Sequence, residues 1–253
     1  MAVIPAALHI LLTAGTRPFM DVVKLMACLD FMMEDAYPGP VGSFPFAELK
    51  KYNTGGKNGK TAHLKGTCVE LFLAEALKLK IHLSMYFGGS LVGNDCKSFF
   101  KPEAIQSLMV LASRLINRHV TVQQDRESVQ QMLQFHRESC GHFSEIFNVL
   151  HAHVPQTLEY FEELQKKINI CFDHWVASGR NVYPKLHTLQ CHVVEFLKGF
   201  PIRLPDIDEQ AVESHNAKLK RSWHTQYVYA NNDTVGLSAC LRNLAYSRLR
   251  KLS

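Results

Sequence analysis

Residues 19–33, FMDVVKLMACLDFMM, and the turn YPGPVG that follows at 37–42 indicate the fold class. Apolar side chains recur in this stretch at intervals of three and four, which places them on one face of an α-helix. Their positions are Phe19, Val22, Val23, Met26, Leu29 and Met33. The prolines and glycines of the turn then end the helix. The stretch therefore predicts an amphipathic helix that packs against a core.

The same spacing recurs through most of the chain. One further helix is predicted around Cys68, Leu71, Phe72, Glu75, Ala76 and Leu79, and it is followed by a Gly-rich loop at 86–96. Another begins at Pro102 and contains Ile105, Leu108, Met109, Leu111, Ala112 and Leu115. The remaining predicted helices span 126–153, 156–177, 184–199, 206–223 and 234–251. Strict alternation, which is typical of strands, is scarce. We therefore expect a mainly α protein with little or no strand, forming a single helical domain over residues 1–253.

Composition narrows the class of protein. The chain has 253 residues, of which 47% are apolar and 20% charged, as in a globular protein rather than a disordered one. It has no run of 18 apolar residues, and its N-terminus lacks the basic start of a secretory signal. The seven cysteines are an odd number with no Cys-x-x-Cys pair. We expect a nuclear or cytoplasmic protein that is not secreted and has no membrane partner.

Positive charge is concentrated near the C-terminus. Residues 213–253 hold seven Lys or Arg and two acidic residues, which accounts for the whole formal excess of +5. Residues 1–212 are balanced, with 21 of each sign. This asymmetry predicts a contact with a polyanion such as DNA. On charge alone, a solvated basic helix without a partner is the more common explanation.

Two pairs of potential metal ligands flank the turn SGRNVYP. Cys171 and His174 are three residues apart, and His187 and Cys191 are four apart, so each pair shares one face of its helix. If the turn brings the pairs together, the four side chains have the composition of a structural zinc site. Against this site, a histidine on an amphipathic helix is more often a structural residue than a ligand.

Two segments near the C-terminus carry a resemblance to a known family: PKLHTLQCHVVEFLKGF at 184–200 and LPDIDEQAVESHNAKLKRSW at 204–223. This region resembles the last part of the RNase H-like DDE transposases, especially Transib-like elements and the catalytic subunit of the V(D)J recombinase. The resemblance implies that His187 and His192 are zinc ligands. It also implies that Glu213 is the metal-binding catalytic glutamate, with Glu209 as the competing candidate. Such enzymes use two divalent cations, Mg²⁺ or Mn²⁺, held by three carboxylates.

The same resemblance implies a role for the basic residues after Glu213. Lys218, Lys220 and Arg221 would meet DNA phosphates beside the metals, and Arg248, Arg250 and Lys251 would extend the basic surface. Contacts of this kind position the nucleic acid without reading its sequence.

The chain also departs from that family. The family's two catalytic aspartates lie on strands of a mixed sheet, whereas Asp21 and Asp30 lie within helical patterns. The family's paired zinc-binding cysteines have no counterpart either. We therefore expect an insertion-like helical body at 1–183 and a transposase-like segment at 184–253, with the RNase H sheet largely or wholly absent. A structural zinc site at His187 and His192 would need two further ligands. Within this chain only Cys171 and His174, or Cys191 in place of His192, are near enough in sequence to supply them, and we expect weak or no stoichiometric zinc.

Three functional hypotheses follow. The first is a transposon-derived fragment that lacks cleavage or strand-transfer activity by itself and retains at most DNA or protein binding. The second is a divergent metal-dependent transposase or nuclease that uses Glu209, Glu213 and a further acid, which a partner chain or a homo-oligomer could supply. The third is a helical protein-interaction module whose basic end is only solvated.

Overall fold

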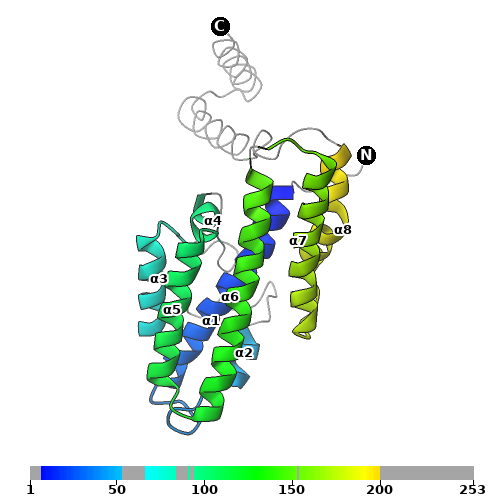
Figure 1. The fold of residues 1–253 in the computed structure, drawn as a ribbon. Helices are drawn as coiled ribbons and strands as arrows, with labels where there is room; N and C mark the ends of the chain where they lie inside the picture. Colours follow the sequence, from blue (N-terminus) through cyan, green and yellow to red (C-terminus); the bar gives the residue numbers. More distant parts are fainter. Residues whose placement is uncertain (1–6, 53–65, 84–90, 92–93, 153, 200–253) are drawn as a thin grey trace, which may run out of the picture. The chain divides into compact units, whose positions relative to one another are not determined.

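The computed structural model describes residues 7–52, 66–83, 91, 94–152 and 154–199 (Figure 1). The chain divides into two units, Met1–Pro205 and Asp206–Ser253, and all described residues belong to the first. The regular elements in these ranges are all α-helices: α1 (Ala7–Met32), α2 (Phe46–Tyr52), α3 (Thr67–Lys78), α4 (Asn94–Phe99), α5 (Pro102–His119), α6 (Gln123–His151), α7 (Leu158–Ala177) and α8 (Pro184–Gly199). The predicted mainly α fold is confirmed for this part of the chain.

Most predicted helices coincide with observed ones. Proline stands at the first position of both α5 and α8, where its fixed φ suits a helix start and its missing N–H costs nothing. The last residues of the loop predicted at 86–96 form the start of α4 instead. The predicted helices at 206–223 and 234–251 lie outside the described residues. None of the described helices is apolar over a length that would cross a membrane.

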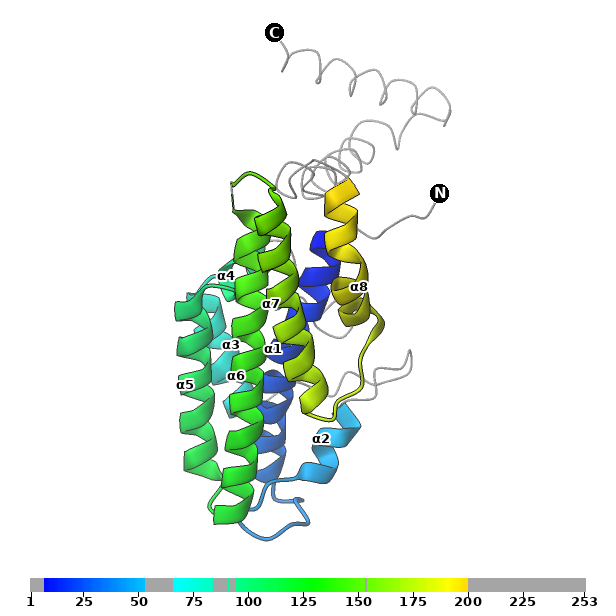
Figure 2. The ribbon, with the colours of Figure 1, turned by 45° about the vertical axis from the view of Figure 1, so that its right-hand side comes forward.

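Helix α1 is the centre of the described unit. It packs against α2, α3, α5, α6 and α8, and Figures 1 and 2 show these helices gathered around it. Its predicted apolar stripe is fully buried from Phe19 to Leu29, whereas Met33 is exposed. Side chains outside that stripe, including Leu25 and Cys28, are buried as well. Burial on all sides explains why this helix is apolar around most of its circumference.

Aromatic rings connect the helices around α1. Phe19 contacts Phe72 of α3 and Phe99 of α4, with ring centroids 5.8 and 5.0 Å apart. Phe100 continues the series to Phe147 of α6, at 5.0 Å. Tilted and edge-to-face rings at these distances add about 0.5–1.5 kcal/mol per pair to the burial of their area. The series joins segments that are far apart in sequence into one core.

A proline inside α1 leaves a carbonyl that a distant tyrosine satisfies. Pro18 has no N–H, so the carbonyl of Ala14 one turn earlier lacks its usual helical donor. The hydroxyl of Tyr183, at the turn before α8, donates to that carbonyl over 3.1 Å. Burial raises the pKa of Tyr183, which keeps the phenol protonated and able to donate. The start of α8 is thus tied directly to α1.

Candidate functional site

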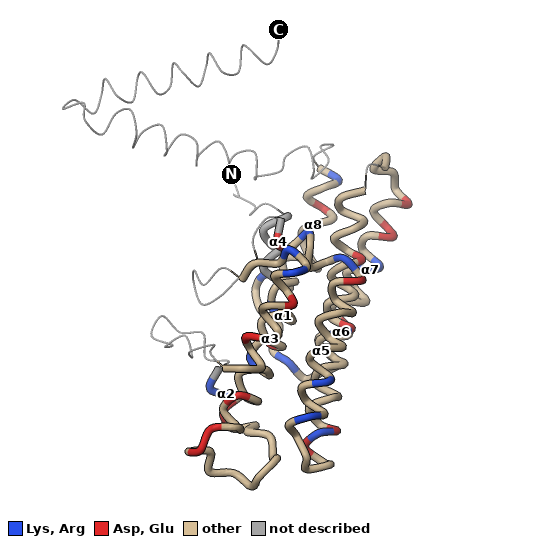
Figure 3. The backbone as a smooth tube through the Cα atoms, turned by 90° about the vertical axis from the view of Figure 1, so that its left-hand side faces the viewer, with Lys and Arg blue, Asp and Glu red and all other residues tan. Residues whose placement is uncertain are grey.

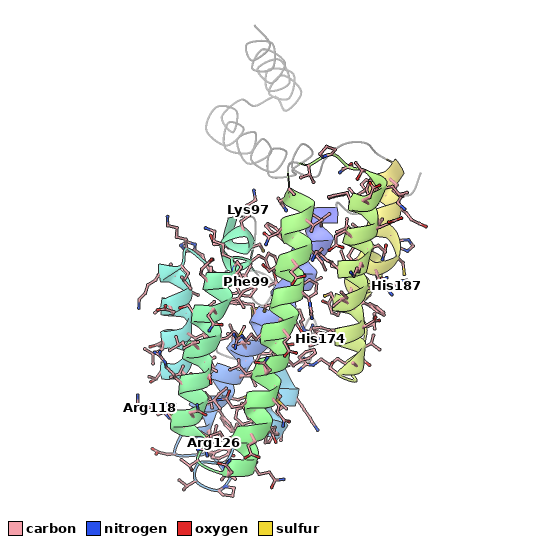
Figure 4. All side chains as sticks on the ribbon, viewed as in Figure 1. Lys97, Phe99, Arg118, Arg126, His174 and His187 are labelled. Atoms are coloured by element: carbon pink, nitrogen blue, oxygen red, sulfur yellow. The ribbon has the colours of Figure 1, made fainter. Side chains whose placement is uncertain are left out.

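Helix α8 carries the histidines that the family resemblance singled out. It buries Leu186, Leu189, Val193, Val194 and Leu197, and it packs against α1 and α7. This apolar face fixes the rotation of the helix and leaves His187, Cys191 and His192 exposed. Figure 4 shows His187 at the outer edge of α8.

Two of these side chains are in contact. The Nδ1 atom of His187 lies 3.5 Å from the Sγ atom of Cys191, one turn later on the same face. The rings of His187 and His192 are 6.0 Å apart between centroids and nearly perpendicular, at 88°. An offset of five residues turns His192 about 140° around the helix from His187, and the two rings nevertheless approach each other edge to face.

The other two candidate zinc ligands are engaged elsewhere. Cys171 is 2% exposed in the core, and burial raises the pKa of its thiol to about 12. His174 stacks on Phe135 of α6, with ring centroids 4.7 Å apart, and its Nδ1 lies 3.8 Å from the carboxylate of Glu138. Figure 4 shows it between α6 and α7. In the part of the chain that the structure describes, no three His, Cys, Asp or Glu side chains are placed to hold one metal ion. The closed site of Cys171, His174, His187 and Cys191 is therefore not formed.

Asp30 caps a helix that is distant in sequence. Its two carboxylate oxygens accept hydrogen bonds from the backbone N–H groups of Cys68, at 2.7 Å, and Val69, at 2.9 Å. These N–H groups belong to the first turn of α3, whose own N-cap, Gly66, has no side chain to offer. Gly66 adopts φ +138°, and a Cβ added there would lie 2.3 Å from the carboxyl carbon of Asp30. Glycine is therefore required where the two helices meet.

Asp21 lies in a buried ionic cluster. Its Oδ2 atom is 3.1 Å from Nη1 of Arg180 in the α7–α8 turn, and its Oδ1 atom is 3.0 Å from Nζ of Lys24. Arg17 adds a longer contact at 3.6 Å. The guanidinium of Arg180 also lies over the ring of Phe135, 4.7 Å from its centroid. This arrangement neutralises a carboxylate that would be costly to bury alone.

His136 of α6 completes the cluster, and sequence reasoning missed it. It is 2% exposed, and its Nε2 atom lies 3.3 Å from Nη2 of Arg180. Burial, followed by the nearby positive charge of Arg180, lowers its pKa to about 4 despite the opposing effect of Asp21. The imidazole is thus neutral near pH 7, and its Nε2 accepts from the guanidinium. Its buried Nδ1 atom has no hydrogen-bond partner among the described residues.

The acidic and basic candidates of the transposase-like segment cannot be placed. Glu209, Glu213 and the basic residues Lys218, Lys220, Arg221, Arg248, Arg250 and Lys251 lie outside the described residues. Comparisons with protein families, curated proteins and solved structures found no match to this chain.

Proposed function

We propose that the chain is a helical nucleic-acid-binding protein of DDE transposase descent that does not cleave or join strands by itself. The observation that carries the binding role is the charge distribution, because the whole excess of +5 lies in residues 213–253. On the described helices, Lys and Arg are interspersed with Asp and Glu (Figure 3). A basic end on a balanced body favours phosphate contacts at that end.

The roles of Asp21 and Asp30 support the absence of catalysis in the isolated chain. A two-metal site needs carboxylates that converge on cations about 4 Å apart. These two aspartates lie nine residues apart on α1, which separates them by roughly 13 Å along the helix axis. One is held in an ion pair with Arg180 and the other caps α3. Phosphodiester chemistry would therefore require carboxylates other than Asp21 and Asp30.

The binding role is tested by titrating the full chain with fluorescent duplex DNA at a series of salt concentrations. Replacing Lys218, Lys220 and Arg221 together with glutamine should weaken binding about equally for unrelated sequences. It should also flatten the slope of log K against log salt concentration by up to about three units, because each lost phosphate contact removes about 0.9 from that slope.

A matched triple variant neutralises three exposed lysines of the helical body, Lys80, Lys101 and Lys166, and should leave the salt slope within one unit of wild type. Absence of binding at low salt, or binding that the first triple variant does not change, would favour a protein-interaction module instead. Magnesium-dependent cleavage that is lost in Glu213→Gln would contradict the inactive chain and favour the divergent nuclease.

A further inference from the structure

We propose that Arg180 and His136 form an acid-sensitive latch, in which protonated His136 takes the place of Arg180 beside Asp21 and releases the α7–α8 turn. In the structure, the guanidinium of Arg180 contacts both of the other side chains. Its Nη1 atom is 3.1 Å from Oδ2 of Asp21, and its Nη2 atom is 3.3 Å from Nε2 of His136. This inference is independent of the nucleic-acid-binding role, because it rests only on described residues of α1, α6, α7 and the turn.

Arg180 is the member of this cluster that can leave. Its side chain is 34% exposed, whereas the side chain of Asp21 is 6% exposed and His136 is 2% exposed. It belongs to the turn between two helices, and the residue before it, Gly179, has a φ of +70° with no atom within 4 Å of the position of a Cβ. The guanidinium can therefore move into solvent while α1 and α6, which carry the other two side chains, stay in place.

The charges around His136 make a proton there incompatible with the closed latch. The charged groups that act on the imidazole are Asp21, Lys24 and Arg17 of α1 and Arg180 of the turn. Three cations thus surround one carboxylate while His136 is neutral, with Lys24 at 3.0 Å and Arg17 at 3.6 Å from it. A proton on His136 places a fourth positive charge against the guanidinium of Arg180. It also removes the acceptor, because the imidazolium has N–H groups at both nitrogens.

Protonated His136 gains partners that the neutral ring lacks. Because Nε2 of the neutral ring accepts from Arg180, its proton is on Nδ1, which is buried and has no hydrogen-bond partner among the described residues. This unpaired donor is a standing cost of the closed arrangement. Once Arg180 has left, the imidazolium can donate to Asp21, whose charge favours the protonated form, and water can reach Nδ1. Acid thus exchanges one cation for another at a carboxylate that stays paired.

Trp175 reports on the latch, because its indole Nε1 donates to the carbonyl of Asn181 in the turn over 3.2 Å and its ring lies 5.7 Å from the guanidinium of Arg180. The test follows solvent exchange of this indole proton by NMR from pH 7.5 to pH 5, in the full chain with Trp223→Phe, which leaves one tryptophan. With a pKa of about 4 for His136 in the closed latch and about 6.5 for a free imidazole, opening should become at least about 30-fold more frequent at pH 5. Far-UV circular dichroism should show unchanged helicity over the same range. Exchange that does not rise, or that rises only as helicity is lost, would overturn the proposal.

Variants in the same background assign the roles. His136→Gln takes up no proton in this range and should abolish the acid-induced rise in exchange. Arg180→Gln lacks the guanidinium, so its exchange should already be fast at pH 7.5 and should not rise further at pH 5. His142→Gln removes a half-buried histidine of the same helix outside the cluster and should keep the full rise. A rise that persists in His136→Gln, or slow exchange at pH 7.5 in Arg180→Gln, would contradict the latch.

Discussion

Replacing Asp30 with alanine should destabilise the protein by about 2–5 kcal/mol. Asp30 is 7% exposed, and its carboxylate accepts two backbone hydrogen bonds at the start of α3. Each buried N–H left without an acceptor costs about 1–3 kcal/mol. The loss of negative charge at a helix N-terminus adds about 0.3–1 kcal/mol. These contributions add to about 2–7 kcal/mol, and water that enters the vacated space relieves part of the cost, which leaves about 2–5 kcal/mol.

The assay is urea unfolding followed by far-UV circular dichroism, with the free energy extrapolated to zero denaturant. Asp30→Asn keeps one acceptor oxygen and loses the charge, so its destabilisation should fall between wild type and Asp30→Ala. Asp35→Ala removes an exposed acid beyond the end of α1, and it should change the free energy of unfolding by no more than about 0.5 kcal/mol.

The outcome that contradicts this reasoning is specific. If the free energy of unfolding of Asp30→Ala lies within about 0.5 kcal/mol of the wild-type value and the m-value is unchanged, the two hydrogen bonds do not stabilise the start of α3. The N–H groups of that turn would then find solvent or other acceptors at no cost.

Other features give three further predictions. In the folded state the pKa of His136 is lowered to about 4, whereas the unfolded imidazole titrates near 6.5. The unfolded state therefore binds the proton first, and the free energy of unfolding should fall by roughly 3 kcal/mol as the pH drops from about 6.5 to about 4. His136→Gln should reduce that fall in urea titrations at several pH values. Gly66→Ala should lower the thermal midpoint because its φ of +138° and the 2.3 Å approach exclude a side chain, whereas Gly141→Ala, with open space at its Cβ, should not. In a Cys240→Ser background, a thiol reagent should label Cys191 rapidly and the five buried cysteines only on unfolding, and Cys191→Ser should remove the rapid phase.

Local spacing was sufficient to predict most of the helices. Pro102 and Pro184 begin α5 and α8 as expected, and the four-residue interval between His187 and Cys191 places their side chains in contact. These features depend on helix geometry alone, which a sequence pattern expresses directly. The relation of His187 to its immediate neighbours on α8 was therefore predictable.

The partners of buried polar groups were not predictable in this way. Arg180 and Asp21 are separated by 159 positions, and the carboxylate of Asp30 caps a helix that begins nearly forty residues later. Such contacts follow from how whole helices pack, which no local period encodes. The signal that was available is the placement of Asp21 and Asp30 within the apolar stretch 19–33, since a charge inside such a run needs a buried partner.

The hydrogen bond from Tyr183 to Ala14 has a consequence during synthesis. At about 5–20 residues per second, a ribosome takes roughly 10–30 s to proceed from the end of α1 to the end of α8. Throughout that interval, the carbonyl that Pro18 leaves open and the apolar surface that α8 covers remain exposed on the nascent chain. Among the described helices, α1 is therefore made before those that cover it and is enclosed last. Shielding of α1 by a chaperone should affect the yield of folded protein more strongly than shielding of any later described helix.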